Sequence, residues 1–374
     1  MRIVLFCHSL ISDWNHGNAH FLRGVIRDLQ SRGHETCVYE PVNGWSLQNL
    51  VRENGAEAIS AFSEVYPSLR SRFYEVETID LDEALDGADL VIVHEWSDHE
   101  IVRRIGDHRL KNKYQLLFHD THHRGVTDPE SISLYALEKF DGVLAFGEVL
   151  RELYLRMGWA SRVWTWHEAA DTTLFLPVDC IAMAGDVTWI GNWGDDERTA
   201  ELSAYFIEPI AQLGLHANVY GVRYPDEART RLADAGIQYL GWMPNYRVPE
   251  ALCRHRATAH IPRQPYVKAL PGIPTIRVFE ALACGIPLVC SPWNDAENLF
   301  TAGKDFLMAA NPEEMKRHLR TVVLDAAVAR ELSMNGLKTI RERHTCRHRV
   351  DELLQIVSEL NGGRECTLLS LDPA

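Results

Sequence analysis

The sequence predicts an α/β protein of two domains, each built on a parallel β-sheet that helices cover on both faces. Short, almost entirely apolar runs alternate with amphipathic helical segments, and this pattern is typical of a sheet buried on both sides. The alternation fills the first part of the chain, is interrupted once, and then starts again. The length of 374 residues agrees with two domains, since a domain typically has about 100–200 residues.

The first domain begins with a β-rich apolar run at residues 2–7, which predicts its first strand. A polar loop follows, and residues 18–31 have the apolar spacing of a helix, which Gly33 ends. The same alternation continues to residue 168. Further strands are predicted at 34–39, 89–96, 114–119, 141–146 and 161–166, with a helix over 148–157.

A break follows the first domain at residues 168–185, where Pro177 and a run of small residues interrupt the pattern. We therefore predict a first domain over 1–168, a linker over 169–185 and a second domain over 186–345. In the second domain, strands are predicted at 186–191, 216–221, 237–242, 257–262 and 287–291, with helices over 198–213 and 227–235.

The end of the chain, after Asn311, is predicted to be helical. A closing helix over 346–361 is expected to pack back on the first domain. Residues 362–374 are expected to form a loose tail.

The composition excludes some functional classes. The formal net charge is −14, whereas a general nucleic-acid binder needs a basic surface, so we expect no nucleic-acid partner. None of the eight cysteines forms a pair with the spacing of a zinc or redox motif, which indicates a reducing compartment. The sequence has no cleavable leader pattern and no apolar stretch near the roughly 18 residues of a membrane span, so we expect a cytoplasmic protein without a transmembrane segment.

The loops that follow the strands are the candidate binding sites, because ligands of open α/β sheets bind outside the carboxyl ends of the strands. The first such loop ends in His16, Gly17 and Asn18 at the start of a helix. Glycine permits close backbone approach, and a helix N-terminus offers free N–H groups to an anion. The alternative is an ordinary turn between strand and helix, with Asn18 as the helix cap.

The second candidate is the segment FHDTHHR, which follows a predicted strand and contains His119. Its histidines suit general acid or base chemistry, contacts to a sugar, or a metal. Zinc usually needs a fourth ligand, and no paired ligand is evident, so we predict no metal site. The alternative is a set of surface histidines in a polar loop.

The third candidate is the segment WIGNWGDDERT, in which Gly191 and Gly194 free a turn and Arg198 starts a helix. A cation beside a helix N-terminus favours a diphosphate. The acidic residues before Arg198 are unfavourable next to phosphate, and their alternative role is to cap the helix.

The fourth candidate is the segment HIPRQPYVKALPGIPTIRVFEALACGIPLV. Its loop contains Arg263, Lys268 and Gly272, and its helix contains Arg277 and Glu280 on one side. A carboxylate at this place can accept both hydroxyls of a ribose. The alternative is an exposed ion pair between Arg277 and Glu280, which stabilises a helix by only about 0.2–0.5 kcal/mol.

The fourth segment also carries a resemblance to a known family. FEALACGIPLV resembles the Glu-containing helix in the second domain of GT-B glycosyltransferases, especially the retaining, glycogen-synthase-like group. AADTTLFLP is similar to the interdomain segment of that group, and TIRVFEALACG with HTCRHRVDELL is closest to the CgeB-like (spore maturation) branch. The resemblance covers residues 169–355, and only the order of elements matches before them. It implies two Rossmann-like domains that face a cleft.

The resemblance implies roles for individual residues. Glu280 matches the second Glu of a paired motif and holds the donor ribose, while Gly272 stands where the first Glu would contact the donor sugar. Asn192 stands where the family has an arginine, and Arg198 matches a later cation on the diphosphate. Arg263 and Lys268 are expected to compensate, and His119 matches an active-site histidine near the transferred sugar.

These observations predict a glycosyltransferase of the hexosyltransferase type, which moves a sugar from a nucleoside-diphosphate sugar to a hydroxyl of a small molecule, glycan or protein. The resemblance favours retention, and we expect no metal and no cofactor. The base is expected near residues 239–244, with Trp242 at the donor, and the acceptor near residues 9–17. Two alternatives are a non-catalytic sugar or nucleotide binder, and an oxidoreductase or nucleotide-sugar epimerase. Exposed rings could stack on sugars, although core packing explains aromatic residues equally well; the candidates are Trp14, Trp45, Trp96 and Trp193.

Overall fold

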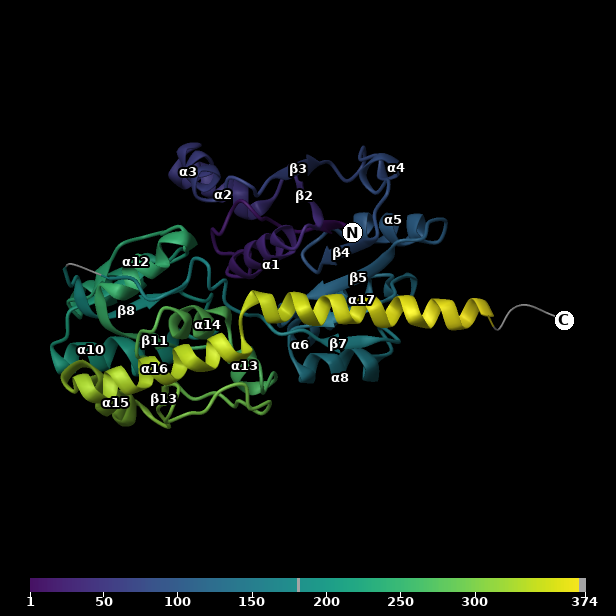
Figure 1. Cartoon of the computed structure of the whole chain (residues 1–374). Helices are drawn as coiled ribbons and strands as arrows, with labels where there is room; N and C mark the ends of the chain where they lie inside the picture. The colour runs from purple at the N-terminus through teal and green to yellow at the C-terminus, as the bar shows by residue number, and fades with distance from the viewer. Residues whose placement is uncertain (180–181, 370–374) are drawn as a thin grey trace. The chain divides into compact units, whose positions relative to one another are not determined.

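The computed structural model describes residues 1–179 and 182–369, and they form two compact units (Figure 1). The first unit contains Met1–Ser12, Val25–His167 and the chain from Cys346 onward. The second contains Asp13–Gly24 and Glu168–Thr345. The predicted linker over 169–185 thus lies in the second unit, apart from residues 180–181, which lie outside the described residues. The segment Asp13–Gly24, which the sequence analysis assigns to the first domain, also lies in the second unit.

The first unit is built on a parallel sheet of seven strands in the order β3-β2-β1-β4-β5-β6-β7. The inner strand β1 pairs Leu5 with Val38 on one side and with Ile92 on the other, and these apolar residues are buried. The edge strand β3 was not predicted, because its sequence SRFY has no apolar run. The strands are β1 (Arg2–Phe6), β2 (Glu35–Pro41), β3 (Ser71–Tyr74), β4 (Leu90–His94), β5 (Gln115–Asp120), β6 (Gly142–Ala145) and β7 (Val163–Thr165).

Helices of the first unit connect these strands, and the last helix of the chain joins them. The helix α17 packs on this unit through two buried hydrogen bonds: Trp166 Nε1 donates to the Arg349 carbonyl at 2.8 Å, and Gln115 Nε2 donates to the Val357 carbonyl at 2.9 Å. The predicted packing of the closing helix on the first domain is therefore confirmed. The helices are α1 (Ala19–Ser31, whose residues up to Gly24 belong to the second unit), α2 (Trp45–Asn54), α3 (Glu57–Val65), α4 (Leu81–Ala84), α5 (His99–Arg109), α6 (Arg124–Thr127), α7 (Pro129–Ser133), η1 (Leu137–Lys139), α8 (Glu148–Met157) and α17 (Cys346–Leu369).

The helix α17 is longer than the sequence suggests. It continues to Leu369, where the sequence analysis expects a tail from residue 362. The extension includes glycine at 362 and 363, but an interior glycine costs only about 1 kcal/mol relative to alanine and does not by itself end a helix. The last part of the predicted tail, residues 370–374, lies outside the described residues.

The second unit is built on a parallel sheet of six strands in the order β10-β9-β8-β11-β12-β13. Its core contains Val187, Phe206, Ile210 and Ala257, each no more than 1% exposed. The strands are β8 (Gly185–Ile190), β9 (Ala217–Tyr220), β10 (Gln238–Tyr239), β11 (His255–His260), β12 (Leu288–Cys290) and β13 (Leu307–Met308).

The helices of the second unit include one that the sequence predicts as a single segment over 198–213. The structure has three pieces there, and the middle one is a π-helical turn. Pro209, which follows that turn, has no backbone N–H to donate to the helix, which explains the interruption. The helices are α9 (Thr199–Leu202), η2 (Ser203–Ile207), α10 (Glu208–Leu213), α11 (Asp226–Asp234), η3 (Asn245–Arg247), α12 (Val248–Cys253), α13 (Gln264–Lys268), α14 (Ile276–Ala283), α15 (Pro312–Leu324) and α16 (Ala326–Arg343).

In both sheets, the order of the strands reverses next to the first strand of the unit. The chain builds outward from β1 to β2 and β3 and then returns to place β4 on the other side of β1. The second unit repeats this with β8, β9, β10 and then β11. Ligands of such sheets bind where the order reverses, outside the carboxyl ends of the two strands concerned. The topology therefore directs attention to the loops after β1 and β4, and after β8 and β11.

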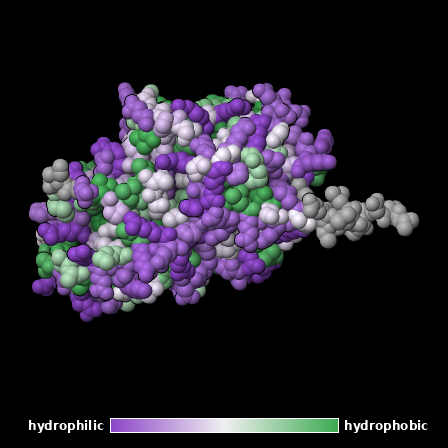
Figure 2. All heavy atoms as spheres, in the orientation of Figure 1, coloured by the Kyte–Doolittle hydropathy of each residue, from purple (hydrophilic) through white to green (hydrophobic). Residues whose placement is uncertain are grey.

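Figure 2 shows one side of the molecule, on which hydrophilic residues dominate and apolar residues form small scattered patches. None of the described helices is long and apolar enough to span a membrane.

The Trp166 hydrogen bond provides a test of how α17 is attached. Replacing Trp166 with phenylalanine removes the buried indole N–H and leaves the Arg349 carbonyl without that donor. We expect the free energy of unfolding to fall by about 1–3 kcal/mol, measured by urea denaturation. The matched control is Trp45→Phe, because Trp45 is 44% exposed; equal effects of the two substitutions would contradict this role of Trp166.

Candidate functional site

Arg198 links the two loops at the reversal point of the second sheet. Its side chain is buried, and its guanidinium carbon lies 5.1 Å from the centre of the Trp189 ring. Nη2 donates to the backbone oxygen of Asn192 at 2.7 Å and to the side-chain oxygen of the same residue at 2.6 Å, in the loop after β8. Nη1 donates to the carbonyl of Ile261 at 3.0 Å, in the loop after β11. The predicted residues Arg198 and Asn192 thus lie together at the carboxyl edge of the sheet.

The charge of Arg198 is only partly offset, by the nearby Glu197, which itself pairs with Arg263. Among the residues that the structure describes, none forms an ion pair with it, and its hydrogen bonds go to neutral oxygens. Burial and the nearby Arg263 lower the pKa of Arg198 to about 9. A buried cation whose charge is only partly offset is costly, so this place favours an anion.

Two glycines make room for Arg198. A Cβ atom at position 194 would lie 2.8 Å from both Cγ and Nε of Arg198, and Gly194 has a φ of +96°. A Cβ atom at Gly191 would lie 3.4 Å from Nη2 of the arginine. The loop after β8 can therefore wrap around the guanidinium only with glycine at position 194, where both the space and the backbone require it.

The other two predicted cations differ in position. Arg263 follows β11 and pairs with Glu197 at 2.9 Å, which offsets much of its charge. Its proximity to Arg198 nevertheless contributes to the lowered pKa there. Lys268 ends α13, is exposed, and donates to Gln264 at 2.6 Å. The structure thus brings Arg263 to Arg198 but places Lys268 in no contact with either.

Glu280 lies on α14 with its carboxylate almost fully buried, at 1% exposure. Oε1 accepts a hydrogen bond from Asn245 Nδ2 at 2.6 Å and lies 3.4 Å from His20 Nδ1, while Oε2 pairs with Arg277. His20 Nε2 accepts the backbone N–H of Asp171 at 2.8 Å, so the ring proton is assigned to Nδ1, which faces Glu280. The ion pair with Arg277 exists, but it is not an exposed pair on a solvated helix face, because Glu280 is buried.

The segment Asp13–Gly24 contributes to this site. The sequence did not predict that this segment belongs to the second unit. Asp13 Oδ1 accepts from Trp242 Nε1 at 3.2 Å, and Oδ2 accepts from the Asn245 backbone N–H at 3.0 Å. Asp13 also pairs with the buried Arg23 at 2.9 Å. The predicted donor residue Trp242 is thereby tied to the loop after the first strand. Only the position of Asp13 after that strand could have signalled its role.

The predicted anion loop of His16, Gly17 and Asn18 packs inside the second unit. The side chains of His16 and Asn18 are buried. A Cβ atom at Gly17 would lie 3.2 Å from Cγ2 of Ile276, at the start of α14. Gly17 thus permits close packing against α14.

His119 does not lie in an open loop. It is part of β5 in the first unit and is 1% exposed, with its ring 4.8 Å from that of Trp166 and 5.4 Å from that of His94. Burial lowers the pKa of His119 to about 3, so the imidazole is neutral at pH 7. The rings of His122 and His123 lie next to each other, with centroids 3.9 Å apart and a tilt of 34° between the ring planes. No group of three or more His, Cys, Asp or Glu side chains in the described ranges could hold a metal ion.

Gly272, where the resemblance places a missing glutamate, is required by its surroundings. It has a φ of +92°, and its N–H donates to the Asn294 carbonyl at 2.6 Å. A Cβ atom there would lie 2.7 Å from Cγ of Glu297 and 2.8 Å from its Oε1. The side chain of Glu297, from the loop after β12, therefore occupies the space beside Gly272.

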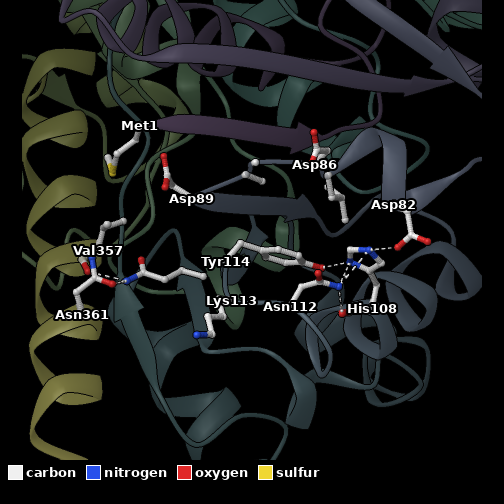
Figure 3. Close-up of a pocket in the computed structure, with 14 residues that line it drawn as sticks. Met1, Asp82, Asp86, Asp89, His108, Asn112, Lys113, Tyr114, Val357 and Asn361 are labelled. Carbon is white, nitrogen blue, oxygen red and sulfur yellow. Dashed lines mark hydrogen bonds and ion pairs between the residues drawn. The ribbon is translucent and has the colours of Figure 1, made fainter. Parts of the chain in front are cut away.

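A cavity of about 600 Å³ lies at the opposite edge of the first sheet, next to the amino ends of β1, β4 and β5 (Figure 3). Its polar side chains pair with one another: His108 Nε2 lies 3.0 Å from Asp82 Oδ1, and His108 Nδ1 lies 3.0 Å from the Tyr114 hydroxyl (Figure 3). Because ligands of open α/β sheets bind at the carboxyl edge, this cavity is not the candidate site.

The comparisons with known proteins bear on the second unit and on the fold of the chain. Residues 198–355 match the family model described as glycosyl transferase-like. Three solved structures match nearly the whole chain, and the first is sucrose-phosphate synthase from Thermosynechococcus elongatus, with 13% identity, a TM-score of 0.66 and coverage of 97% of this chain and 100% of that one. The second is HepE of Anabaena in complex with UDP and glucose, with 13% identity, a TM-score of 0.66 and coverage of 96% of this chain and 100% of that one. The third is an α-glucosyltransferase in complex with UDP and DNA, with 12% identity, a TM-score of 0.70 and coverage of 96% of this chain and 99% of that one. None of the curated proteins matches the chain by sequence.

The chain has the fold of GT-B glycosyltransferase structures, with two α/β units on parallel sheets. The glycosyl transferase-like family model covers residues 198–355, which is most of the second unit, and agrees with the glycosyltransferase enzyme predicted from the sequence. The predicted fold class is confirmed.

Glu168 provides a test of the electrostatics around Glu280. This buried residue accepts the backbone N–H of Ile276 at the start of α14, and burial together with the nearby Glu280 raises its pKa to about 8. The folded protein therefore keeps a proton that the unfolded chain loses near pH 4.5. The stability contributed by this proton is fully present below pH 4.5 and is lost as the pH rises through 8.

We expect Glu168→Gln to remove this pH dependence. Relative to the variant, the wild-type protein should lose stability between pH 5 and 8 by at most about 1.4 kcal/mol per pH unit, measured by urea denaturation at each pH. Parallel pH profiles of the two proteins would show that Glu168 is ionised in the folded state.

Proposed function

We propose that this glycosyltransferase transfers a sugar from a UDP-sugar to a hydroxyl acceptor with release of UDP, and that the second unit binds the donor. The observation that carries the proposal is the buried, only partly offset charge of Arg198 at the reversal point of the sheet. A diphosphate bears the anionic charge that this place favours. UDP is favoured as the nucleotide because HepE and the α-glucosyltransferase, which share the fold, are in complex with it.

The reaction needs a group that stabilises the diphosphate as its bond to the sugar breaks. Arg198 is fixed by three neutral acceptors, so it can meet the developing charge without reorganising, and Arg263 adds a second cation nearby. Lys268 is our proposed third cation, with its flexible side chain at the surface. The glycines at 191 and 194 keep the loop close to Arg198.

The nucleoside part is proposed to lie along α14 and the loop after β10. Glu280, held by Asn245 and His20, accepts the ribose hydroxyls, with Arg277 beside it. Trp242, anchored by Asp13, lines the place of the base. We further propose retention at the anomeric carbon, catalysis by these cations without a metal ion, and membership of the CgeB-like branch.

The ribose assignment is tested with Glu280→Gln. Loss of a charge-assisted hydrogen bond costs about 1.5–3 kcal/mol, so the Michaelis constant for UDP-glucose should rise about ten- to hundredfold. The Michaelis constant is measured from the rate of UDP release at varied concentrations of UDP-glucose. The matched control is Glu250→Gln, because Glu250 forms the same type of i,i+3 pair with Arg247, but with both side chains 61% exposed. The ribose assignment fails if the two variants behave alike.

The diphosphate assignment is tested with Arg198→Lys, which keeps a charge but loses the planar fork. Because the fork holds both loops, we expect UDP to bind at least about tenfold more weakly, while free uridine, which lacks phosphate, binds with unchanged affinity. Titration calorimetry measures both. If uridine and UDP weaken equally, Arg198 supports the fold of the site and does not meet the phosphates.

A further inference from the structure

Two of the ten tryptophans are exposed, and both follow strands at the carboxyl edge of the first sheet. Trp96 comes two residues after β4 and is 43% exposed; Trp45 begins α2, after β2, and is 44% exposed. Strand β1 lies between β2 and β4, so the two loops are two strand spacings apart, or roughly 10 Å. Trp14 and Trp193, the other rings considered from the sequence, are buried in the second unit.

Trp96 is exposed and yet held in place. The guanidinium carbon of Arg124 lies 4.9 Å from the centre of its ring, and the His122 ring packs against it in a T-shaped arrangement with the centroids 5.0 Å apart. Arg124 is itself fixed, because Nη1 donates to the Glu95 carbonyl at 2.9 Å. A ligand that stacks on Trp96 therefore does not have to order the indole, which lowers the entropy cost of binding.

The groups around Trp96 are polar and mostly uncharged. The His8 ring, after β1, lies 6.3 Å from the Trp96 ring, and burial lowers the pKa of His8 to about 4, so it is neutral at pH 7. A neutral imidazole can both donate to and accept from a hydroxyl. The loop after β2 touches the same residue, since a Cβ atom at Gly44 would lie 3.3 Å from the His8 carbonyl.

These features suit one class of ligand. A pyranose ring has an apolar C–H face, which is attracted to the negative face of an indole, and hydroxyl groups around its edge. An anionic acceptor such as DNA is disfavoured, because the protein has a net charge of −14 and Arg124, the cation beside Trp96, is already engaged. We propose that Trp96, assisted by Trp45 and His8, is a stacking platform for a neutral saccharide, and hence that the acceptor is a glycan. This inference rests on the proposed transferase function.

The experiment measures UDP release from UDP-glucose with and without neutral disaccharides, namely maltose, cellobiose and lactose. We expect at least one of them to accelerate release, and Trp96→Ala to raise its Michaelis constant by at least about tenfold. The constant for the donor and the slow release without acceptor should stay unchanged. Trp96→Phe keeps a flat ring and should retain most of the affinity.

The matched control is Phe73→Ala, because Phe73 is also an exposed aromatic residue, at 48%, but lies on the edge strand β3. It should leave all three measurements unchanged. Quenching of tryptophan fluorescence by the disaccharide, present in the wild type and lost in Trp96→Ala, provides a readout that does not need turnover.

The inference is overturned if no disaccharide accelerates release, or if Trp96→Ala leaves the saccharide constant as it was. Failure of the proposed function looks different: UDP does not bind and no release occurs even without acceptor. If UDP is still released without acceptor but no saccharide accelerates its release, the donor site stands and only the glycan acceptor is rejected.

Discussion

The buried carboxylate of Glu280 joins three segments that are far apart in the sequence. Asn245 comes from the loop after β10, His20 from the first turn of α1, and Glu280 from α14. Asp13 reinforces the arrangement, because it accepts hydrogen bonds from both Trp242 and Asn245. A buried carboxylate is stable only when its oxygens have partners, so these segments have to meet at this point for the second unit to be complete. The proposed donor site is therefore built from the same contacts that stabilise the unit.

Charge is distributed unevenly around this point. The chain is acidic as a whole, yet the reversal point of the second sheet holds Arg198 without a carboxylate partner among the described residues. Its neighbour Arg263 has one, Glu197. The difference matters because an arginine paired with a carboxylate attracts an anion only weakly. A buried arginine without such a pair is stabilised when an anion binds beside it. Electrostatic complementarity to a diphosphate thus comes from one residue and the loop that surrounds it.

Much of the fold could be predicted from the sequence, since apolar runs and glycine stops mark the central strands and α14. The edge strand β3 could not, because an edge strand with polar residues has no periodic signal. Glu280 and Arg198 were found because each sits at a loop or helix that follows a strand. His20, Asp13 and Asn245 were missed because their role depends on contacts between distant segments.

His119 shows a second limit of the sequence. All six residues of β5 are buried, so the pattern does not reveal which way a side chain in this strand points. The exposed position at this edge is held by Trp96, which enters the sequence analysis only as one aromatic residue among many. Exposure, which separates Trp96 from the buried tryptophans, is a property of the folded unit.

The most direct test of the donor site is a crystal structure of the protein with UDP. The account predicts the diphosphate within hydrogen-bonding distance of the Arg198 guanidinium and the ribose hydroxyls at the Glu280 carboxylate. A diphosphate bound elsewhere, with Arg198 still bonded only to Asn192 and Ile261, would contradict it.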